Sequence, residues 1–313
     1  MSQKSTKVRD TAIDAIKGLL VLLIVLAHNT ASDPFILKFT HPAMIGIFFI
    51  VSGYLFSTKR GLVQKLRGIL LPFCFFVIVS ILWRYLYGFI SHEPLLWWQW
   101  LMEVLSGTDW GLNIPMWFLL SLAEIISLIV VLTKYVHERY ARFSIALVGM
   151  FVGLKLQNEG ISPLYISRSL AYVPFFLIGT ELKSAPPILP HGKYPLLTMA
   201  AIVAILVARY LYLIDIIWQK WLVDSVLALL IGYLLYNIFK WPHFPSKLFE
   251  YFGKNSLVVL CMHILILDVV WRVWWSLCGE PNKFDALLQT IIITLLLVPC
   301  CEVYNRYLRD KLK

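Results

Sequence analysis

An ammonium group and an imidazole share one face of the first apolar segment, IDAIKGLLVLLIVLAHNT, in which Lys17 and His28 are eleven residues apart. On a helix, eleven residues return to within about 20° of the starting face and advance roughly 16 Å. Ionisable side chains are costly inside a bilayer, so they usually face a bundle interior and mark a site. The spacing predicts a path along one helix face, from a cation near one membrane surface to a base near the other.

His28 and Asp14 are the candidate catalytic residues. A poorly solvated histidine favours the neutral form, which a general base requires. The alternative for His28 is a structural imidazole bonded to a carbonyl or a polar neighbour. Asp14 lies three residues before Lys17, so the two can pair near the membrane surface, and Lys17 can equally bind a phosphate group.

A basic cluster of Lys59, Arg60, Lys65 and Arg67 follows the second apolar segment. Lysine and arginine both bind phosphates, and arginine does so through two parallel hydrogen bonds. The cluster is therefore interpreted either as an orientation signal or as a phosphate-binding mouth. Pro72 is expected to open the third span.

Polar residues within other apolar segments have both structural and functional interpretations. Ser52 and Gly53 allow close helix packing in the middle of a span. Asn255 stands at a helix entrance, where its side chain can cap free backbone N–H groups. His263, eight residues further, is expected either to be functional or simply to be hydrogen-bonded. Asp268 is expected to pair inward.

Composition indicates a membrane protein. The 313 residues are 59% hydrophobic and 15% charged, whereas soluble domains carry about 25% charged residues. A span needs about 20 mainly apolar residues, which predicts an all-α, polytopic transmembrane bundle of about ten spans forming a single domain, 1–313. The predicted spans are 13–31, 42–57, 69–90, 115–133, 143–157, 168–182, 195–214, 221–239, 255–276 and 285–304. The proline-rich linker 183–195 divides six spans from four and is a plausible hinge.

The basic residues indicate orientation. If the spans alternate in direction, nineteen of the 28 lysines and arginines fall on one side, so both termini are expected to be cytoplasmic. The net charge of +10 then reflects orientation and attraction to anionic lipid headgroups, and not nucleic acid. The opposite side carries the stretch 91–114, whose tryptophans suit a membrane interface and could also stack on a sugar. These tryptophans are Trp97, Trp98, Trp100 and Trp110.

No nucleotide-binding, metalloprotease or serine-hydrolase motif occurs in the sequence. The five cysteines fit no metal pattern and are interpreted as small buried hydrophobic residues, so no metal site is expected.

The ordered motifs resemble the acyltransferase 3 family, integral membrane O-acyltransferases that modify sugars. The family's first helix typically reads D-G-L-R-G, and ten residues separate its arginine from a histidine further along. The second helix of the family reads F-F-x-x-S-G-Y. The matching stretches are Asp14 to Gly18 with His28, Phe48 to Tyr54, Lys65 to Pro72, Trp117 to Leu119, Phe175 to Gly179, and Gly253 to Leu257 with His263. Lys17 stands where the family has arginine, which keeps the cation but loses the bidentate fork.

The resemblance implies transfer of an acyl group, most often acetyl, from cytoplasmic acyl-CoA to a hydroxyl of a cell-surface or lipid-linked glycan. It implies that acyl-CoA is a substrate and that no cofactor is bound. His28 would act as general base or as a covalent acyl relay. The implied acyl-CoA-binding residues are Lys17, Lys65, Arg67 and Arg60. The implied structural or site-lining residues are Ser52, Gly53, Tyr54, Trp117, Asn255 and His263.

The expected partners are acyl-CoA, the glycan acceptor and membrane lipids, in a bacterial-type cytoplasmic (inner) membrane. The alternative function is a polytopic transporter or flippase of a glycan or lipid-linked precursor. Against it, the sequence has no paired broken helices in matching halves.

Overall fold

The computed structural model describes residues 10–29, 34–57, 61–91, 98, 102, 105–107, 113–184, 195–210, 217–241 and 244–312. Within these ranges the chain is helical and contains no strand. The prediction of an all-α fold is therefore confirmed for the described part of the chain. Most of the linker 183–195 and most of the tryptophan-rich stretch lie outside it, although Trp98 is described and exposed.

Each of the ten predicted spans falls on a helix of the described chain. These helices are α1 (Thr11–His28), α2 (Pro34–Leu55), α3 (Leu62–Ser91), α5 (Trp117–Tyr135), α6 (Arg139–Asn158), α7 (Ile166–Ser184), α8 (Pro195–Tyr210), α9 (Ile217–Lys240), α11 (Ser256–Cys278) and α12 (Lys283–Val303). A short helix, α10 (Lys247–Lys254), precedes α11, and single turns occupy Ile114–Met116 (η1), Pro163–Tyr165 (η2) and Tyr304–Leu308 (η3).

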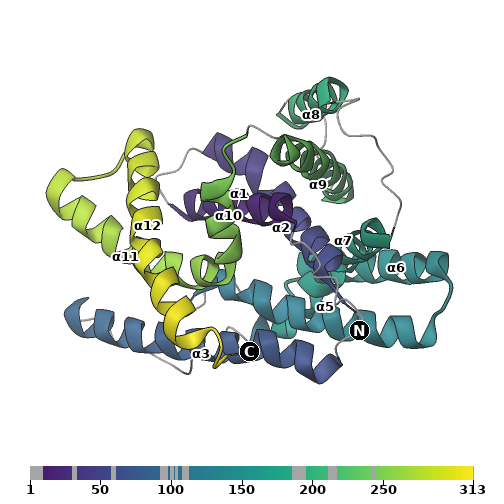
Figure 1. Ribbon diagram of the computed structural model, residues 1–313, viewed down its shortest axis with the longest axis horizontal. Coiled ribbons are helices and arrows are strands. Elements are labelled where there is room, and N and C mark those ends of the chain that lie inside the picture. The colour runs from purple at the N-terminus through teal and green to yellow at the C-terminus, as the bar shows by residue number, and fades with distance from the viewer. Residues whose placement is uncertain are drawn as a thin grey trace, which may run out of the picture.

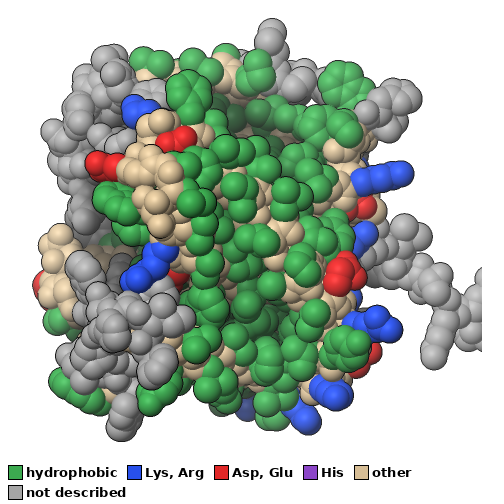
Figure 2. Space-filling model, turned by 90° about the vertical axis from the view of Figure 1, so that its left-hand side faces the viewer, with side chains coloured by type: hydrophobic (Ala, Val, Ile, Leu, Met, Phe, Trp, Pro, Cys, Tyr) green, Lys and Arg blue, Asp and Glu red, His purple; other side chains and the backbone are tan. Residues whose placement is uncertain are grey.

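Six helices of the described chain are long and apolar enough to cross a membrane. They are Thr11–His28, Leu62–Leu86, Ile114–Tyr135, Leu222–Lys240, Ser256–Cys278 and Lys283–Leu308, and Ala43–Leu55 is a shorter apolar helix. In Figure 2, hydrophobic side chains cover a broad band on one face, with charged side chains towards its margins. Such an extensive apolar surface suits lipid, and the protein is a multi-pass integral membrane protein.

α1 lies at the centre of the bundle and contacts α2, α9, α10, α11 and α12 (Figure 1). At its start, the carboxylate of Asp10 accepts a hydrogen bond from the backbone N–H of Ala12 and lies 3.1 Å from Nζ of Lys240. At its end, Nδ2 of Asn29 donates to Oε1 of Gln289 over 2.9 Å. Both ends of α1 are thus fixed to other helices, which holds the residues between them in place.

α10 crosses α1 at a contact that only glycine permits. A Cβ atom on Gly18 would lie 1.8 Å from the carbonyl oxygen of Phe249, and one on Gly253 would lie 1.7 Å from that of Asp14. Small residues allow helix backbones to approach this closely. The first and the last of the sequence motifs therefore meet at one crossing.

At the contact of α2 with α7, as at the α1–α10 crossing, each helix places a glycine against the backbone of the other. A Cβ atom on Gly53 would lie 2.0 Å from the carbonyl oxygen of Phe176, and one on Gly179 would lie 1.9 Å from that of Ile50. The prediction that Gly53 serves close packing is confirmed.

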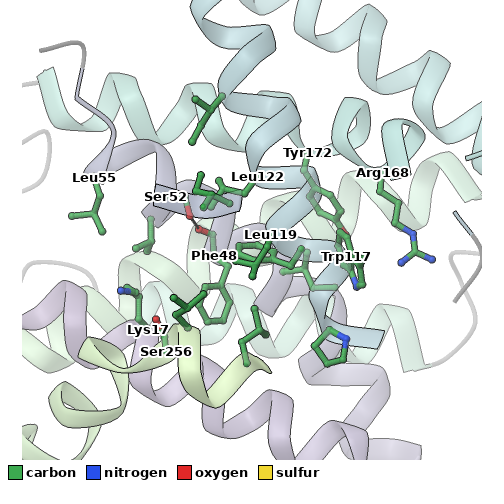
Figure 3. A pocket seen from close by; sticks show the side chains of 18 of the residues that line it. Lys17, Phe48, Ser52, Leu55, Trp117, Leu119, Leu122, Arg168, Tyr172 and Ser256 are labelled. Atoms are coloured by element: carbon green, nitrogen blue, oxygen red, sulfur yellow. Dashed lines mark hydrogen bonds between the residues drawn. The ribbon is translucent and has the colours of Figure 1, made fainter. Parts of the chain in front are cut away.

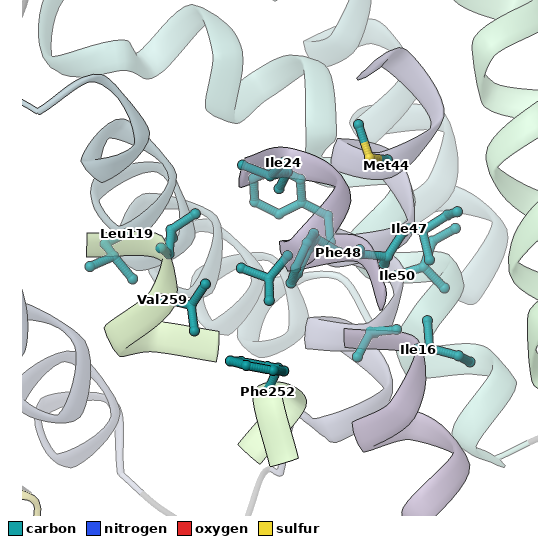
Figure 4. Close-up of a cluster of buried hydrophobic side chains, with 14 of the residues drawn as sticks. Ile16, Ile24, Met44, Ile47, Phe48, Ile50, Leu119, Phe252 and Val259 are labelled. Atoms are coloured by element: carbon teal, nitrogen blue, oxygen red, sulfur yellow. The ribbon is translucent and has the colours of Figure 1, made fainter. Parts of the chain in front are cut away.

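Apolar side chains of α1, α2, α5, α10 and α11 form one buried cluster (Figure 4). Ile16, Phe252 and Val259 are at most 2% exposed. Because protein interiors are packed to nearly crystalline density, this cluster holds the central helices in fixed positions.

The prediction that Pro72 opens the third span is wrong, because α3 begins at Leu62 and Pro72 lies inside it. The preceding residues, LVQKLRGILL, are mostly good helix formers. A proline within a membrane helix is tolerated where neighbouring groups satisfy the freed carbonyl. Lys65 and Arg67 therefore belong to the first turns of a helix and point to different faces.

Asn255 lies between α10 and α11, but its predicted side-chain cap is absent. Its Nδ2 donates to the carbonyl oxygen of Tyr251 over 2.9 Å, and its Oδ1 accepts from Nδ2 of Asn305 over 2.7 Å. The side-chain oxygen that would cap α11 thus bonds instead to the segment that follows α12.

Candidate active site

A cavity of about 1040 Å³ lies among the helices that carry the sequence motifs. In Figure 3, Lys17 and Leu55 lie at one end of this cavity, which we call the lysine end. Trp117 and Arg168 lie at the opposite end, called the arginine end, with Phe48 between the two. The polar side chains of the lining are those of Lys17, His28, Ser52, Ser57, Gln64, Lys65, Trp117, Gln157, Arg168, Tyr172, Asp224 and Ser256.

Lys17 and His28 both line this cavity, together with Ile24 between them on α1. The prediction that the ammonium and imidazole groups share one helix face is confirmed. Eleven residues of helix separate them by roughly 16 Å, so the cavity runs along α1 from a cation to an imidazole.

Lys65 faces the lysine end from the first turns of α3, where Gln64, Gly68 and Ile69 also line the cavity. Its Nζ lies 4.1 Å from the ring centroid of Phe56. Positions i, i+1, i+4 and i+5 form one helix face, and Arg67 lies outside that face.

The other two basic candidates are Arg67 and Arg60, and only Arg67 is among the residues that the structure describes. Arg67 is exposed and does not line the cavity. Arg60 lies outside the described residues, so its predicted role stays a prediction. Lys183, which the sequence interpretation did not single out, donates a hydrogen bond to the carbonyl oxygen of Phe56 beside the lysine end.

The arginine end combines a guanidinium group with aromatic rings. Cζ of Arg168 lies 4.9 Å from the ring centroid of Trp117 and 5.5 Å from that of Tyr165. Leu164 and Tyr165 have φ angles of 51° and 65°, which are uncommon for bulky residues. This strained turn places the Tyr165 ring beside Arg168, and backbone strain of this kind clusters at functional sites.

The imidazole of His28 contacts that of His263, which is fully buried on α11. The ring centroids are 5.1 Å apart, and Nε2 of His263 lies 3.4 Å from Nδ1 of His28. His263 does not itself line the cavity but contacts the histidine that does.

The turn before α5 connects this histidine pair to the arginine end. Nδ2 of Asn113 donates to the carbonyl oxygen of Cys261 over 2.6 Å, two residues before His263. Because η1 follows Asn113 and leads into Trp117, His28 lies towards the arginine end of the cavity.

The remaining candidates have varied positions. Ser52 lines the cavity, and its Oγ donates to the carbonyl oxygen of Phe48 over 2.8 Å. Tyr54 packs against the apolar core and does not line the cavity. Asp14 is 4% exposed and also lies outside the lining. It is separated from His28 by roughly 21 Å of helix, too far for direct contact.

Sequence reasoning missed three polar lining residues near the arginine end and along the cavity wall: Arg168, Tyr172 and Gln157. A charged residue in an apolar stretch such as SRSLAYVPFFLIG was a usable signal for Arg168. Gln157 gave no comparable signal, since a polar residue at a helix end is ordinarily solvated.

Asp268 pairs inward as predicted, with its Oδ2 3.4 Å from Nη1 of Arg84. Glu124 accepts a hydrogen bond from Oγ of Ser169 over 2.5 Å and does not line the cavity. Among the described residues, no group of three or more histidine, cysteine, aspartate or glutamate side chains could hold a metal ion.

The chain matches the family model described as an acyltransferase domain, that of the acyltransferase 3 family, over residues 10–305. Comparisons with curated proteins and with solved structures found no match. Because the family match covers nearly the whole chain and includes every helix that lines the cavity, this protein belongs to the acyltransferase 3 family.

Proposed function

We propose that the protein transfers an acyl group, in the first instance acetyl, from cytoplasmic acyl-CoA to a hydroxyl of a cell-surface or lipid-linked glycan. The observation that carries the proposal is the continuity of one cavity from the lysine end to His28. Membership of an acyltransferase family favours this function over the alternative of a transporter or flippase.

Acyl-CoA would enter at the lysine end. Its phosphates require cations, which Lys17 and Lys65 supply from two helices. The narrow pantetheine arm would follow the face of α1 and bring the thioester towards His28. Arg60 and Arg67 remain candidates for outer phosphate contacts, and Asp14 for pairing with Lys17.

His28 would act as the general base. Its ring nitrogen takes the proton of the acceptor hydroxyl while the hydroxyl oxygen attacks the thioester carbonyl carbon. As the carbon–sulfur bond breaks, the proton passes to the leaving sulfur, so the products are the ester and free CoA thiol.

A covalent relay is the second form of the same reaction. Here a ring nitrogen of His28 attacks the thioester carbonyl carbon, the carbon–sulfur bond breaks and CoA leaves as the thiolate. The acceptor hydroxyl then displaces the acyl group from the imidazole, and the hydroxyl proton is taken up by the thiolate, so the products are again the ester and free CoA thiol. Acyl label on the protein after an acid quench without acceptor would favour this form.

The acceptor would bind at the arginine end. Trp117 and Tyr172 offer aromatic surfaces, and Arg168 and Gln157 offer hydrogen-bond donors. Aromatic surface combined with a few placed polar groups is the usual composition of a small-ligand site.

The proposed topology has about ten spans within a single domain, 1–313, and both termini in the cytoplasm. In this orientation the N-terminal part of α1, with Lys17, faces the compartment that contains acyl-CoA. The excess of basic residues on the same side supports it. The proposed location is a bacterial-type inner membrane.

The test is transfer of radiolabelled acetyl from acetyl-CoA, supplied to the cytoplasmic face of membrane vesicles, into alkali-labile ester on host glycan. We expect label with the wild type, none with His28→Ala, and wild-type label with His137→Ala. His137 is an exposed histidine between α5 and α6 that does not line the cavity. Full transfer by a correctly inserted His28→Ala protein would contradict the proposal.

A further inference from the structure

Two backbone carbonyl groups indicate which histidine donates and which accepts in the contact between His28 and His263. Nδ1 of His263 lies 2.8 Å from the carbonyl oxygen of Val259, one turn earlier on α11. A carbonyl oxygen only accepts, so Nδ1 of His263 must carry a proton. A neutral imidazole carries one N–H, and its lone pair is then on Nε2, the atom that faces His28.

The same reasoning applies to His28. Its Nδ1 lies 2.9 Å from the carbonyl oxygen of Ile24, one turn earlier on α1. This nitrogen therefore also donates, and its single N–H faces two acceptors, the Ile24 oxygen and Nε2 of His263. The lone pair of His28 is then on Nε2.

The opposite arrangement is disfavoured on both helices. If Nε2 of His263 donated to Nδ1 of His28, a lone pair on each Nδ1 would face a carbonyl oxygen, that of Val259 on α11 and that of Ile24 on α1. The two carbonyl groups belong to different helices, and each of them separately favours the Nδ1–H tautomer of the histidine beside it. Together they favour a hydrogen bond from Nδ1 of His28 to Nε2 of His263.

We propose that His263 is a positioning residue that keeps His28 in the Nδ1–H tautomer and so presents Nε2 of His28 as the reacting nitrogen. When Nε2 takes a proton, His28 becomes a cation, and its hydrogen bond to His263 strengthens because one partner is charged. This inference rests on the proposed role of His28 as base or relay, both of which need a lone pair on a ring nitrogen.

A neutral imidazole suits this position better than the carboxylate that often orients a catalytic histidine. His263 is fully buried in a helix apolar enough to span the membrane. A carboxylate there would place a permanent charge inside the bilayer, which is costly. A histidine supplies the required acceptor without that charge.

The first test compares His263→Leu with His263→Gln in purified protein in lipid nanodiscs. A glutamine oxygen can accept from His28 while its NH₂ donates to Val259, whereas leucine offers neither group. For His263→Leu we expect kcat to fall at least about tenfold, since general-base catalysis is worth more than this. We expect the KM for acetyl-CoA to stay within about twofold, and His263→Gln to recover most of kcat.

Met262→Leu is the matched control for packing, because Met262 precedes His263 on α11 and is only partly buried. Its kcat should equal that of the wild type. Equal losses in the leucine and glutamine variants would point to a purely structural role and overturn the proposal, as would full activity of His263→Leu.

The second test needs no turnover and so separates this inference from the proposed reaction. Protein with ¹⁵N-labelled histidine is examined by NMR, and the His28 signals are identified by their loss in His28→Asn. We expect a pyridine-type Nε2 and a pyrrole-type Nδ1 in the wild type and in His263→Gln, and a mixture of tautomers in His263→Leu. A pyridine-type Nδ1 of His28 in the wild type would overturn the proposal even if acetyl transfer is observed. The expected spectrum would support it even if the protein uses another donor.

Discussion

Gly18 and Gly253 face each other across the α1–α10 crossing, where a Cβ atom on either residue would lie no more than 3.0 Å from the backbone nitrogen of the other. The two glycines are distant in sequence but adjoin two functional groups. Lys17 precedes the first, and the second begins the segment that leads to His263. Their contact sets the position of α10 against α1, the helix that carries His28. Because α10 leads directly into α11, the same contact helps to place His263 beside His28.

Gly18→Ala should destabilise the protein, because the added methyl group meets the α10 backbone and not a flexible side chain. Overpacking of this kind costs about 1–3 kcal/mol. The measurement is the thermal unfolding midpoint in detergent. Gly61→Ala is the control, since in the described structure no atom other than those of its chain neighbours lies within 4 Å of the position its Cβ would take. Equal midpoints for the two variants would show that α10 can move away at little cost.

Lys17→Met and Lys65→Met should each raise the KM for acetyl-CoA by about tenfold. A hydrogen bond to a charged group contributes about 1.5–3 kcal/mol, and 1.4 kcal/mol corresponds to a tenfold change in affinity. Lys247→Met, which removes an exposed cation of α10 that does not line the cavity, should leave the KM unchanged.

Acetyl-pantetheine, a donor without the nucleotide phosphates, makes the lysine experiment more specific. With this donor the wild type and the two lysine variants should behave alike. A KM increase that persists with acetyl-pantetheine would mean that the lysines maintain the shape of the cavity instead of binding phosphates.

Arg168→Met should impair use of the acceptor without altering use of the donor. Methionine retains an extended apolar chain beside Trp117 but removes the guanidinium donors. We expect the apparent KM for acceptor to rise about tenfold and the KM for acetyl-CoA to stay constant. Arg139→Met is the control, because Arg139 is exposed on α6 and remote from the lining. The reverse pattern, with the donor KM raised, would assign Arg168 to the acyl-CoA site.

Asn29→Ala should loosen the end of α1 that carries His28. Asn29 is 1% exposed and donates to the side chain of Gln289 and to the carbonyl oxygen of Ala286 on α12. Leaving a buried acceptor without its donor lowers the free energy of unfolding by about 1–3 kcal/mol. Both the unfolding midpoint and kcat should therefore fall. Asn158→Ala, at an exposed asparagine on α6, should change neither. A lower midpoint with unchanged kcat would show that the anchor stabilises the bundle without positioning His28.

Residue type and helix periodicity were sufficient to predict features that depend on a single helix. The common face of Lys17 and His28 follows from 3.6 residues per turn, and the use of Gly53 for close packing follows from its lack of a side chain. Rules based on residue type failed at Pro72, where tolerance of proline inside a membrane helix outweighed its usual place at a helix start. They failed again at Asn255, whose side chain bonds to Asn305 across the bundle instead of capping its own helix.

Three properties of the protein could be predicted from the order of its amino acids: the helical elements, the apolar character that requires a membrane and the helix face shared by Lys17 and His28. These properties depend on residue type and on spacing along one helix. The packing of the helices was needed to show that His263 contacts His28, that Arg168 lies over Trp117 and that Arg67 lies away from the cavity. Each of these depends on how two helices cross, and the close contacts that fix a crossing, such as Gly18 against Gly253, join residues more than two hundred positions apart.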